Sequence, residues 1–307
     1  MGHDGPVPTP PGLWLRPEAG ELAPVLLWKH FRVDEPRRLA ELTVAFQRRH
    51  RLAAAKLMPD IPILFPDFSL SSFSQIAHLR RFGDVRTVGR AADYLAAVAH
   101  ASSLLDHRET LLATVFSPLA LVGLWCGPEA IPELAAAPRA VAHEVLWALS
   151  QLVAQLASAC VASGADGVYY SCWGQDLLSE AEYAELGTPY DLAGLRGAQR
   201  ARVRILHLHG AVLGPPSRYR DYPVEVVGWS EVGSSLGLVE GAAPLPGQLI
   251  MGGISELQQG PPGDLERRHI RELVGRLGDR LVVAPGCSLP DGTTEETLDG
   301  LRELVRG

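Results

Sequence analysis

The sequence predicts a single (β/α)8, or TIM, barrel, in which eight parallel strands alternate with helices. Eight short apolar runs follow one another along the chain, and most of them precede a segment of helical character. The length of 307 residues is typical of such a barrel formed as one domain. An open, doubly wound α/β sheet is the alternative, but no glycine-rich phosphate-binding motif follows any of the expected strands.

The expected elements divide the chain as follows. Strands are expected at residues 24–31, 53–60, 109–118, 165–172, 202–209, 224–229, 248–254 and 281–287. Helices are expected at residues 34–50 with Asp34 as N-cap, 91–105, 138–163, 263–277, and from Thr293 or Thr294 to the end. Residues 1–23 are rich in Pro and Gly and predict an extended arm, followed by one barrel domain over residues 24–307.

Composition argues against several classes of protein. The chain is 47% hydrophobic and 21% charged, which is ordinary for a globular protein. Its net charge of −7 and the lack of a basic tract argue against a nucleic-acid partner. The apolar run at residues 111–124 is too short to span a membrane, and the N-terminus does not resemble a signal peptide. Four scattered cysteines predict no disulfide framework, so we expect a cytoplasmic protein.

Chemistry in a barrel of this kind is expected at the carboxyl ends of the strands. His207 and His209 stand two residues apart at one such end and therefore face the same way. Cys287 ends the last expected strand. Imidazole nitrogen and thiolate sulfur suit zinc, and three protein ligands leave a fourth position open. The alternative is a hydrogen-bonded strand-end histidine beside a buried cysteine.

Other strand ends carry polar and aromatic side chains. Candidates for catalysis or for orienting a substrate are Asp60, Lys56 and His30. Candidates for substrate binding are Trp28, Met58, Tyr170, Ser171, Trp173 and Trp229. The aromatic members suit a flat or methyl-bearing ligand. Capping of a turn by Asp60, and packing of some aromatic rings against the arm, are the structural alternatives.

Three stretches of the chain resemble the uroporphyrinogen decarboxylase superfamily, over roughly residues 24–306. GADGVYYSCWGQDLLSEAEYAELGTPY (164–190) is similar to the family segment around its fourth strand. ILHLHG (205–210) is similar to the His-x-Cys-Gly motif of the methyltransferase branch, and APGCSLPDGTTEETLDGL (284–301) to its final Gly-Cys strand and helix. The resemblance implies a (β/α)8 barrel. It also implies a zinc site, carried over by position to His207, His209 and Cys287.

The chain departs from the family pattern at two places. His209 stands where the methyltransferases have Cys, so a bound zinc would have fewer thiolate ligands and a higher Lewis acidity. A metal other than zinc is the alternative at this site. The paired arginines that bind carboxylates in the decarboxylase are missing from the corresponding stretch of this chain. Lys29 is the cation at the matching position. The sequence Met58-Pro59-Asp60-Ile61 does resemble the decarboxylase segment whose Asp holds pyrrole NH groups.

We therefore predict a zinc-dependent methyltransferase that activates a thiol or similar acceptor for methyl transfer from a corrinoid or another donor. The resemblance implies that a corrinoid would be carried by a partner protein. One alternative is a metal-independent decarboxylase or lyase for a carboxylated small molecule or tetrapyrrole, with Asp60 and a histidine as acid and base. Another is a non-catalytic binding protein. The expected partner is a small molecule, with homodimer formation as an option and with neither nucleic acid nor membrane.

Overall fold

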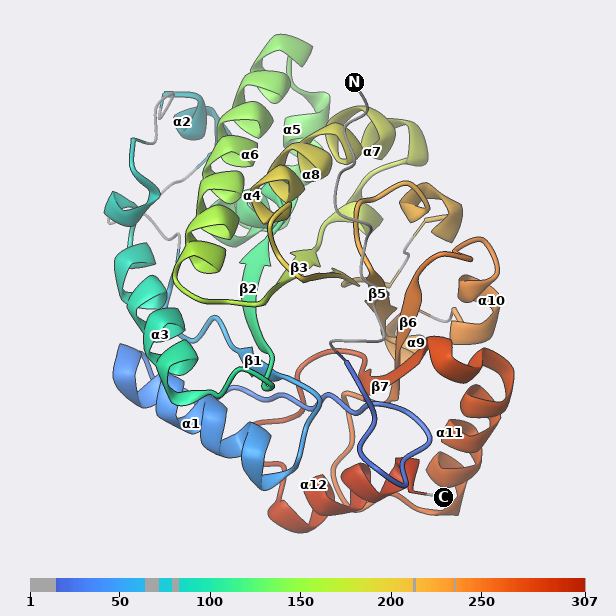
Figure 1. The fold of residues 1–307 in the computed structure, drawn as a ribbon. Helices are drawn as coiled ribbons and strands as arrows, with labels where there is room; N and C mark the ends of the chain where they lie inside the picture. Colours follow the sequence, from blue (N-terminus) through green and yellow to red (C-terminus); the bar gives the residue numbers. More distant parts are fainter. Residues whose placement is uncertain (1–14, 64–71, 79–82, 212–213, 235, 307) are drawn as a thin grey trace, which may run out of the picture.

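A computed structural model describes residues 15–63, 72–78, 83–211, 214–234 and 236–306. Within these residues, the centre of the fold is a curved sheet of seven parallel strands, each paired with the next one in chain order. The strands are β1 (Ala55–Leu57), β2 (Leu111–Phe116), β3 (Gly167–Cys172), β4 (Val203–Leu208), β5 (Val226–Trp229), β6 (Leu249–Ile254) and β7 (Leu281–Pro285). The helices lie around the outside of this sheet (Figure 1).

Helices lie between most of the successive strands along the chain, and one precedes β1. They are α1 (Pro36–Arg49), α2 (Phe73–His78), α3 (Ala91–Leu104), α4 (Pro118–Cys126), α5 (Ala130–Ala136), α6 (Arg139–Ala162), α7 (Glu180–Leu186), α8 (Thr188–Leu195), α9 (Glu231–Ser234), α10 (Leu238–Ala242), α11 (Asp264–Leu277) and α12 (Glu295–Arg302). By length and composition α6 could cross a membrane, but 56% of its most apolar window is buried inside the protein. Core helices of globular proteins share this character.

The N-cap of α1 differs from the prediction. The side chain of Glu35, rather than that of Asp34, accepts hydrogen bonds from the first backbone N–H groups of the helix. Asp34 instead forms an ion pair of 2.6 Å with Arg90, at the start of α3. The longer Glu side chain reaches the same N–H groups from one residue nearer the helix, and this frees Asp34 to link the two helices.

Residues 24–31, expected as the first strand, form isolated bridges at Val25 and Lys29 instead of a regular strand. Val25 pairs in parallel with Val283 of β7. On its other side, the N–H of Ala53 donates to the carbonyl of Val25 at 2.9 Å. The segment therefore makes backbone hydrogen bonds with β7 on one side and with the chain entering β1 on the other.

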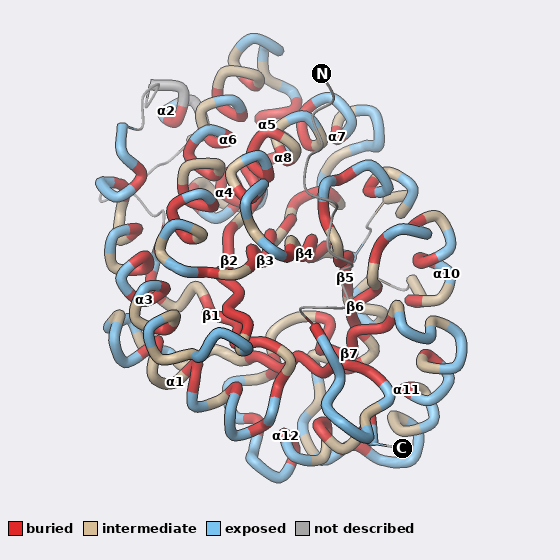
Figure 2. Tube along the Cα trace, viewed as in Figure 1, coloured by how far each residue is buried: buried red, intermediate tan, exposed pale blue. Residues whose placement is uncertain are grey.

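The inner face of the sheet encloses a compact apolar core. Buried residues of this core are Leu15, Leu26, Trp28, Ala54, Met58, Leu112, Tyr169, Val203, Ile205, Val226, Met251, Val282 and Ala284. Most are alternate residues of neighbouring strands, because every second side chain of a strand points inward. Figure 2 shows the buried strands around the centre of the molecule, with the more exposed helices outside them.

The arm contributes to this core through Leu15, which is only 2% exposed. Further along, Glu21 pairs with Arg306 near the end of the chain. The described part of the arm is therefore packed against the sheet, while residues 1–14 of the expected arm lie outside the described residues.

Truncation of Leu15 tests whether the arm is part of the core. We expect Leu15→Ala to lower the free energy of unfolding by about 2–5 kcal/mol, because it leaves a cavity among the inward-facing side chains. Urea denaturation measures the change. Leu265→Ala is the control, since Leu265 is 70% exposed, and it should change stability by no more than about 0.5 kcal/mol. Equal effects of the two substitutions would contradict this role of the arm.

Candidate active site

The structure brings His207, His209 and Cys287 together at the carboxyl end of the sheet. His207 lies inside β4 and is 4% exposed, His209 follows the end of that strand, and Cys287 lies two residues beyond β7. One potential ligand atom from each residue lies within 4.8 Å of the others. The Sγ of Cys287 is 3.6 Å from the Nδ1 of His209. Residues 78 positions apart in the chain thus form one cluster.

The sheet register and one loop contact position the two histidines. His207 pairs with Ser171 of β3, which directs both side chains inward. The N–H of His209 donates to the carbonyl of Cys172 at 2.9 Å, so the parallel pairing continues just beyond the strands. The side-chain amide of Gln175 then donates to the carbonyl of His209 at 2.6 Å. Both backbone polar groups of His209, its N–H and its carbonyl, are therefore hydrogen-bonded.

Mutual hydrogen bonding sets the ionisation of the three groups. Burial alone would raise the pKa of Cys287, but hydrogen bonds from His207 and His209, together with their charge, lower this pKa to about 5. The hydrogen bond with Cys287 raises the pKa of His209, whereas burial lowers the pKa of His207. At neutral pH the cluster therefore contains a thiolate, the form in which cysteine acts as a nucleophile or as a metal ligand.

These three side chains line a cavity of about 290 Å3. Its other lining residues are Trp28, His30, Lys56, Met58, Pro59, Thr114, Phe116, Ala120, Leu124, Tyr169, Ser171, Trp173 and Ser288. Six residues proposed from the sequence are among them: Trp28, His30, Lys56, Met58, Ser171 and Trp173. Its size suits a small molecule, and its wall is largely aromatic and apolar.

Tyr170 and Trp229, also proposed as substrate-binding residues, lie outside the cavity. The hydroxyl of Tyr170 is 3.4 Å from the carboxylate of Asp191, on the helix side of the sheet. The indole N–H of Trp229 donates to the carbonyl of Leu236 at 2.9 Å. Both predictions relied on position near a strand end without regard to which face the side chain occupies.

Tyr169, which sequence reasoning missed, takes the place expected for Tyr170. Its ring centroid lies 5.4 Å from that of His207. The signal was present in the sequence, because Ser171 was placed at the site and Tyr169, two residues earlier in the same strand, must share its face.

Lys56 places a buried amino group on the wall of the cavity. Its Nζ lies 4.1 Å from the ring centroid of Tyr169 and 5.0 Å from that of Trp28. It donates a hydrogen bond of 3.1 Å to the thioether sulfur of Met58. Burial lowers its pKa to about 7. The aromatic faces stabilise the charged form, but solvation by them is weaker than by water.

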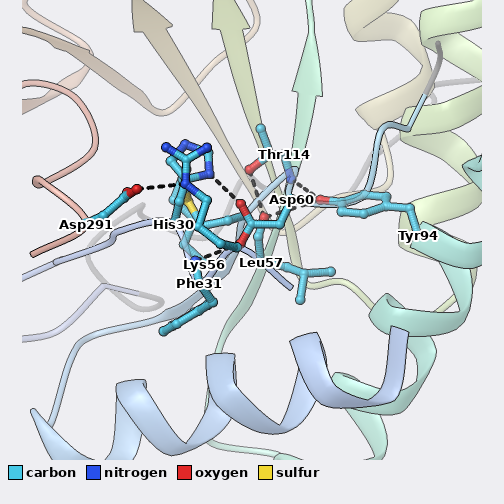
Figure 3. Close-up of polar contacts among 10 residues, drawn as sticks. His30, Phe31, Lys56, Leu57, Asp60, Tyr94, Thr114 and Asp291 are labelled. Atoms are coloured by element: carbon cyan, nitrogen blue, oxygen red, sulfur yellow. Dashed lines mark hydrogen bonds and ion pairs between the residues drawn. The ribbon is translucent and has the colours of Figure 1, made fainter. Parts of the chain in front are cut away.

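Asp60 lies behind the cavity wall and contacts two neighbours on the segment after Trp28. One carboxylate oxygen accepts the N–H of Phe31 at 2.8 Å. The other forms a short hydrogen bond with Nδ1 of His30 (Figure 3). Asp60 is absent from the cavity lining, whereas His30 is part of it.

The low pKa of Cys287 can be tested by alkylation. In chelator-treated protein, we expect the rate of Cys287 modification by iodoacetamide to rise with pH through about 5 and then to level, since the thiolate is the reactive form. Mass spectrometry locates the modified residue. Cys160, whose pKa burial raises to about 12, is an internal control that should stay unmodified. His209→Gln should move the midpoint upward, and a wild-type midpoint near the ordinary thiol pKa of about 8.5 would contradict the arrangement.

Comparisons with known proteins agree with this architecture. The sequence model of uroporphyrinogen decarboxylase (URO-D) matches residues 32–307. A methyltransferase from Methanosarcina mazei has a similar structure, with a TM-score of 0.78 and 16% identity over 95% of both chains. A B12-independent methionine synthase from Shewanella sp. W3-18-1 gives a TM-score of 0.60 and 10% identity, over 93% of this chain and 92% of that chain.

At these identities the two structures establish a shared fold. No curated protein matches the sequence. The family model, however, covers all but the first 31 residues of the chain. The chain therefore belongs to the uroporphyrinogen decarboxylase family.

Proposed function

We propose that this protein is a zinc-dependent methyltransferase that activates a thiol or a similar acceptor. The observation that carries the proposal is the convergence of His207, His209 and Cys287 at the wall of a small-molecule cavity. The similarity to structures described as a methyltransferase and a methionine synthase supports the same class. We also propose that residues 24–29 complete the scaffold as the eighth member of a (β/α)8 barrel.

The donor set fits zinc in chemistry, and one pair of its ligand atoms has the matching separation. Two imidazoles and one thiolate are ordinary zinc ligands, and a catalytic site of three protein ligands leaves one position for a substrate. Around a tetrahedral zinc with ordinary bond lengths, sulfur and nitrogen ligands would be separated by about 3.6 Å. The observed separation of Cys287 Sγ and His209 Nδ1 is 3.6 Å. This pair is therefore already at the separation that a shared zinc requires, and all three ligand atoms lie within 4.8 Å of one another.

The chemistry assigned to the bound ion is to lower the pKa of a thiol acceptor, so that a thiolate nucleophile exists at neutral pH. The protein's own residues would shape the pocket around that thiol. Trp28 and Trp173 would exclude water and contact the apolar part of the acceptor. Lys56, buried on the same wall, would orient the acceptor through its amino group.

The methyl donor and its carrier are part of the proposal. A donor would approach the cavity from the carboxyl ends of the strands, because its lining residues lie there. We propose that the methyl donor is a corrinoid on a partner protein. We also propose that this protein is cytoplasmic and forms a homodimer.

Metal analysis tests the ligand set. Protein purified without chelator is expected to contain about one zinc per chain. Replacement of His207, His209 or Cys287 by Ala should weaken zinc binding at least about 100-fold, because each supplies a ligand. The matched control is His269→Ala, since His269 is paired with Glu231 at 2.8 Å and lies outside the cavity. Wild-type protein that is active without metal would end the proposal.

A metal-independent carboxy-lyase is the second candidate, and the His30–Asp60 pair is the observation that favours it. An imidazole held by a carboxylate can donate or accept a proton, and Lys56 on the same cavity could bind a substrate carboxylate. This candidate is weakened by the absence of the paired arginines expected for a polycarboxylated tetrapyrrole.

The two candidates differ in their response to metal removal. A lyase of this kind should release carbon dioxide at an unchanged rate after EDTA treatment and in Cys287→Ala, because no ligand is needed. The same rate should fall about 100-fold or more in Asp60→Asn, where the imidazole loses its carboxylate. Loss of activity in Cys287→Ala would instead support the methyltransferase.

A further inference from the structure

The His30–Asp60 pair has the geometry of an oriented base. The side chain of Asp60 is 2% exposed, and both of its oxygens are engaged, one by the N–H of Phe31 and the other by Nδ1 of His30 (Figure 3). With no free oxygen, this carboxylate has little capacity to bind a substrate. Its role is instead to fix the position of the imidazole, as carboxylates do behind catalytic histidines.

This contact determines which nitrogen of His30 can act as a base. A carboxylate accepts a hydrogen bond, so Nδ1 carries the proton and the lone pair of the neutral ring is on Nε2. Among the described residues, no hydrogen bond engages that Nε2. The ring lines the same cavity as His207, His209 and Cys287, and 31% of its side chain is exposed. A proton taken up from the cavity can therefore pass on to solvent.

We propose that His30, oriented by Asp60, accepts the proton that a thiol substrate loses on entering the site. This inference rests on the proposed function, since it concerns the acceptor thiol. The S–H bond breaks and its electron pair stays on sulfur, while an N–H bond forms at Nε2 of His30. The negative charge of Asp60 stabilises the resulting imidazolium, which then releases the proton to water at the mouth of the cavity.

The other titratable groups at the cavity are less suited to this task. His207, His209 and Cys287 are assigned to the metal, and their lone pairs are then occupied. Lys56 is 8% exposed and packed between Tyr169, Trp28 and Met58, so a proton that it accepted would have no direct way to water. His30 combines a free nitrogen, a carboxylate behind it and contact with solvent.

Stopped-flow absorption of cobalt(II)-substituted protein tests the role of His30. The probe is 2-mercaptoethanol, mixed at pH 6.5, about two units below the ordinary pKa of a thiol, so that it must lose a proton to bind as a thiolate. The sulfur-to-metal absorption band reports that event. We expect the rate constant for its appearance to fall about 100-fold or more in His30→Gln.

The final amplitude and the thiol concentration at half-saturation should stay near wild-type values in His30→Gln, because a proton relay changes the rate and not the equilibrium. Asp60→Asn should slow the reaction in the same direction, since an amide can donate to Nδ1 and favour the wrong tautomer. His269→Gln is the matched control, because it removes an imidazole from a comparable carboxylate pair with Glu231, and its rate should equal that of wild type.

An unchanged rate in His30→Gln would overturn this inference and leave the proposed function intact. A His30→Gln protein that loses amplitude as well as rate would assign His30 a structural role and also overturn it. If wild-type protein takes up cobalt but gives no thiolate band, or takes up none, the proposed function itself fails and this inference fails with it.

Discussion

The parallel hydrogen-bonded register of the sheet is the constraint on which the site depends. Because Ser171 pairs with His207 and Cys172 with Leu208, every inward position on β3 faces an inward position on β4. That alternation sends Tyr169 and Ser171 into the cavity and Tyr170 toward the helices. A shift of one residue in this pairing would exchange the two sets of side chains. The set of side chains that lines the cavity therefore depends on the pairing register of β3 and β4 as well as on the residues in these strands.

The sequence allowed much of this arrangement to be predicted, for reasons that particular residues make clear. His207, His209 and Cys287 could be grouped because carboxyl ends of parallel strands meet at one edge, whatever the distance along the chain. Tyr170 and Trp229 were wrongly assigned to the site because the prediction located the strand ends but not the face of the sheet on which each side chain lies. The alternation already implied by Ser171 would have selected Tyr169 instead.

Other features depend on loop geometry that no periodicity describes. The pairing of His30 with Asp60 joins the segment after Trp28 to the segment after β1, and Arg32, two residues beyond His30, has a φ of 55°. Few residues other than glycine adopt such a backbone conformation, so neither propensity nor pattern predicts it at an arginine. Residues 24–29 likewise pair with both neighbours through isolated bridges, although their composition is that of a strand.

The cluster is also asymmetric, and this bears on how an ion would enter and leave. His207 is buried in the sheet, whereas His209 is exposed just past a strand end and Cys287 is partly exposed in a loop. An ion arriving from solution would meet the outer pair first and the fixed inner imidazole last. Release would run in the reverse order, through states in which an incoming chelator replaces one outer ligand at a time. Exchange of a bound ion with a cellular metal donor would then need no opening of the sheet.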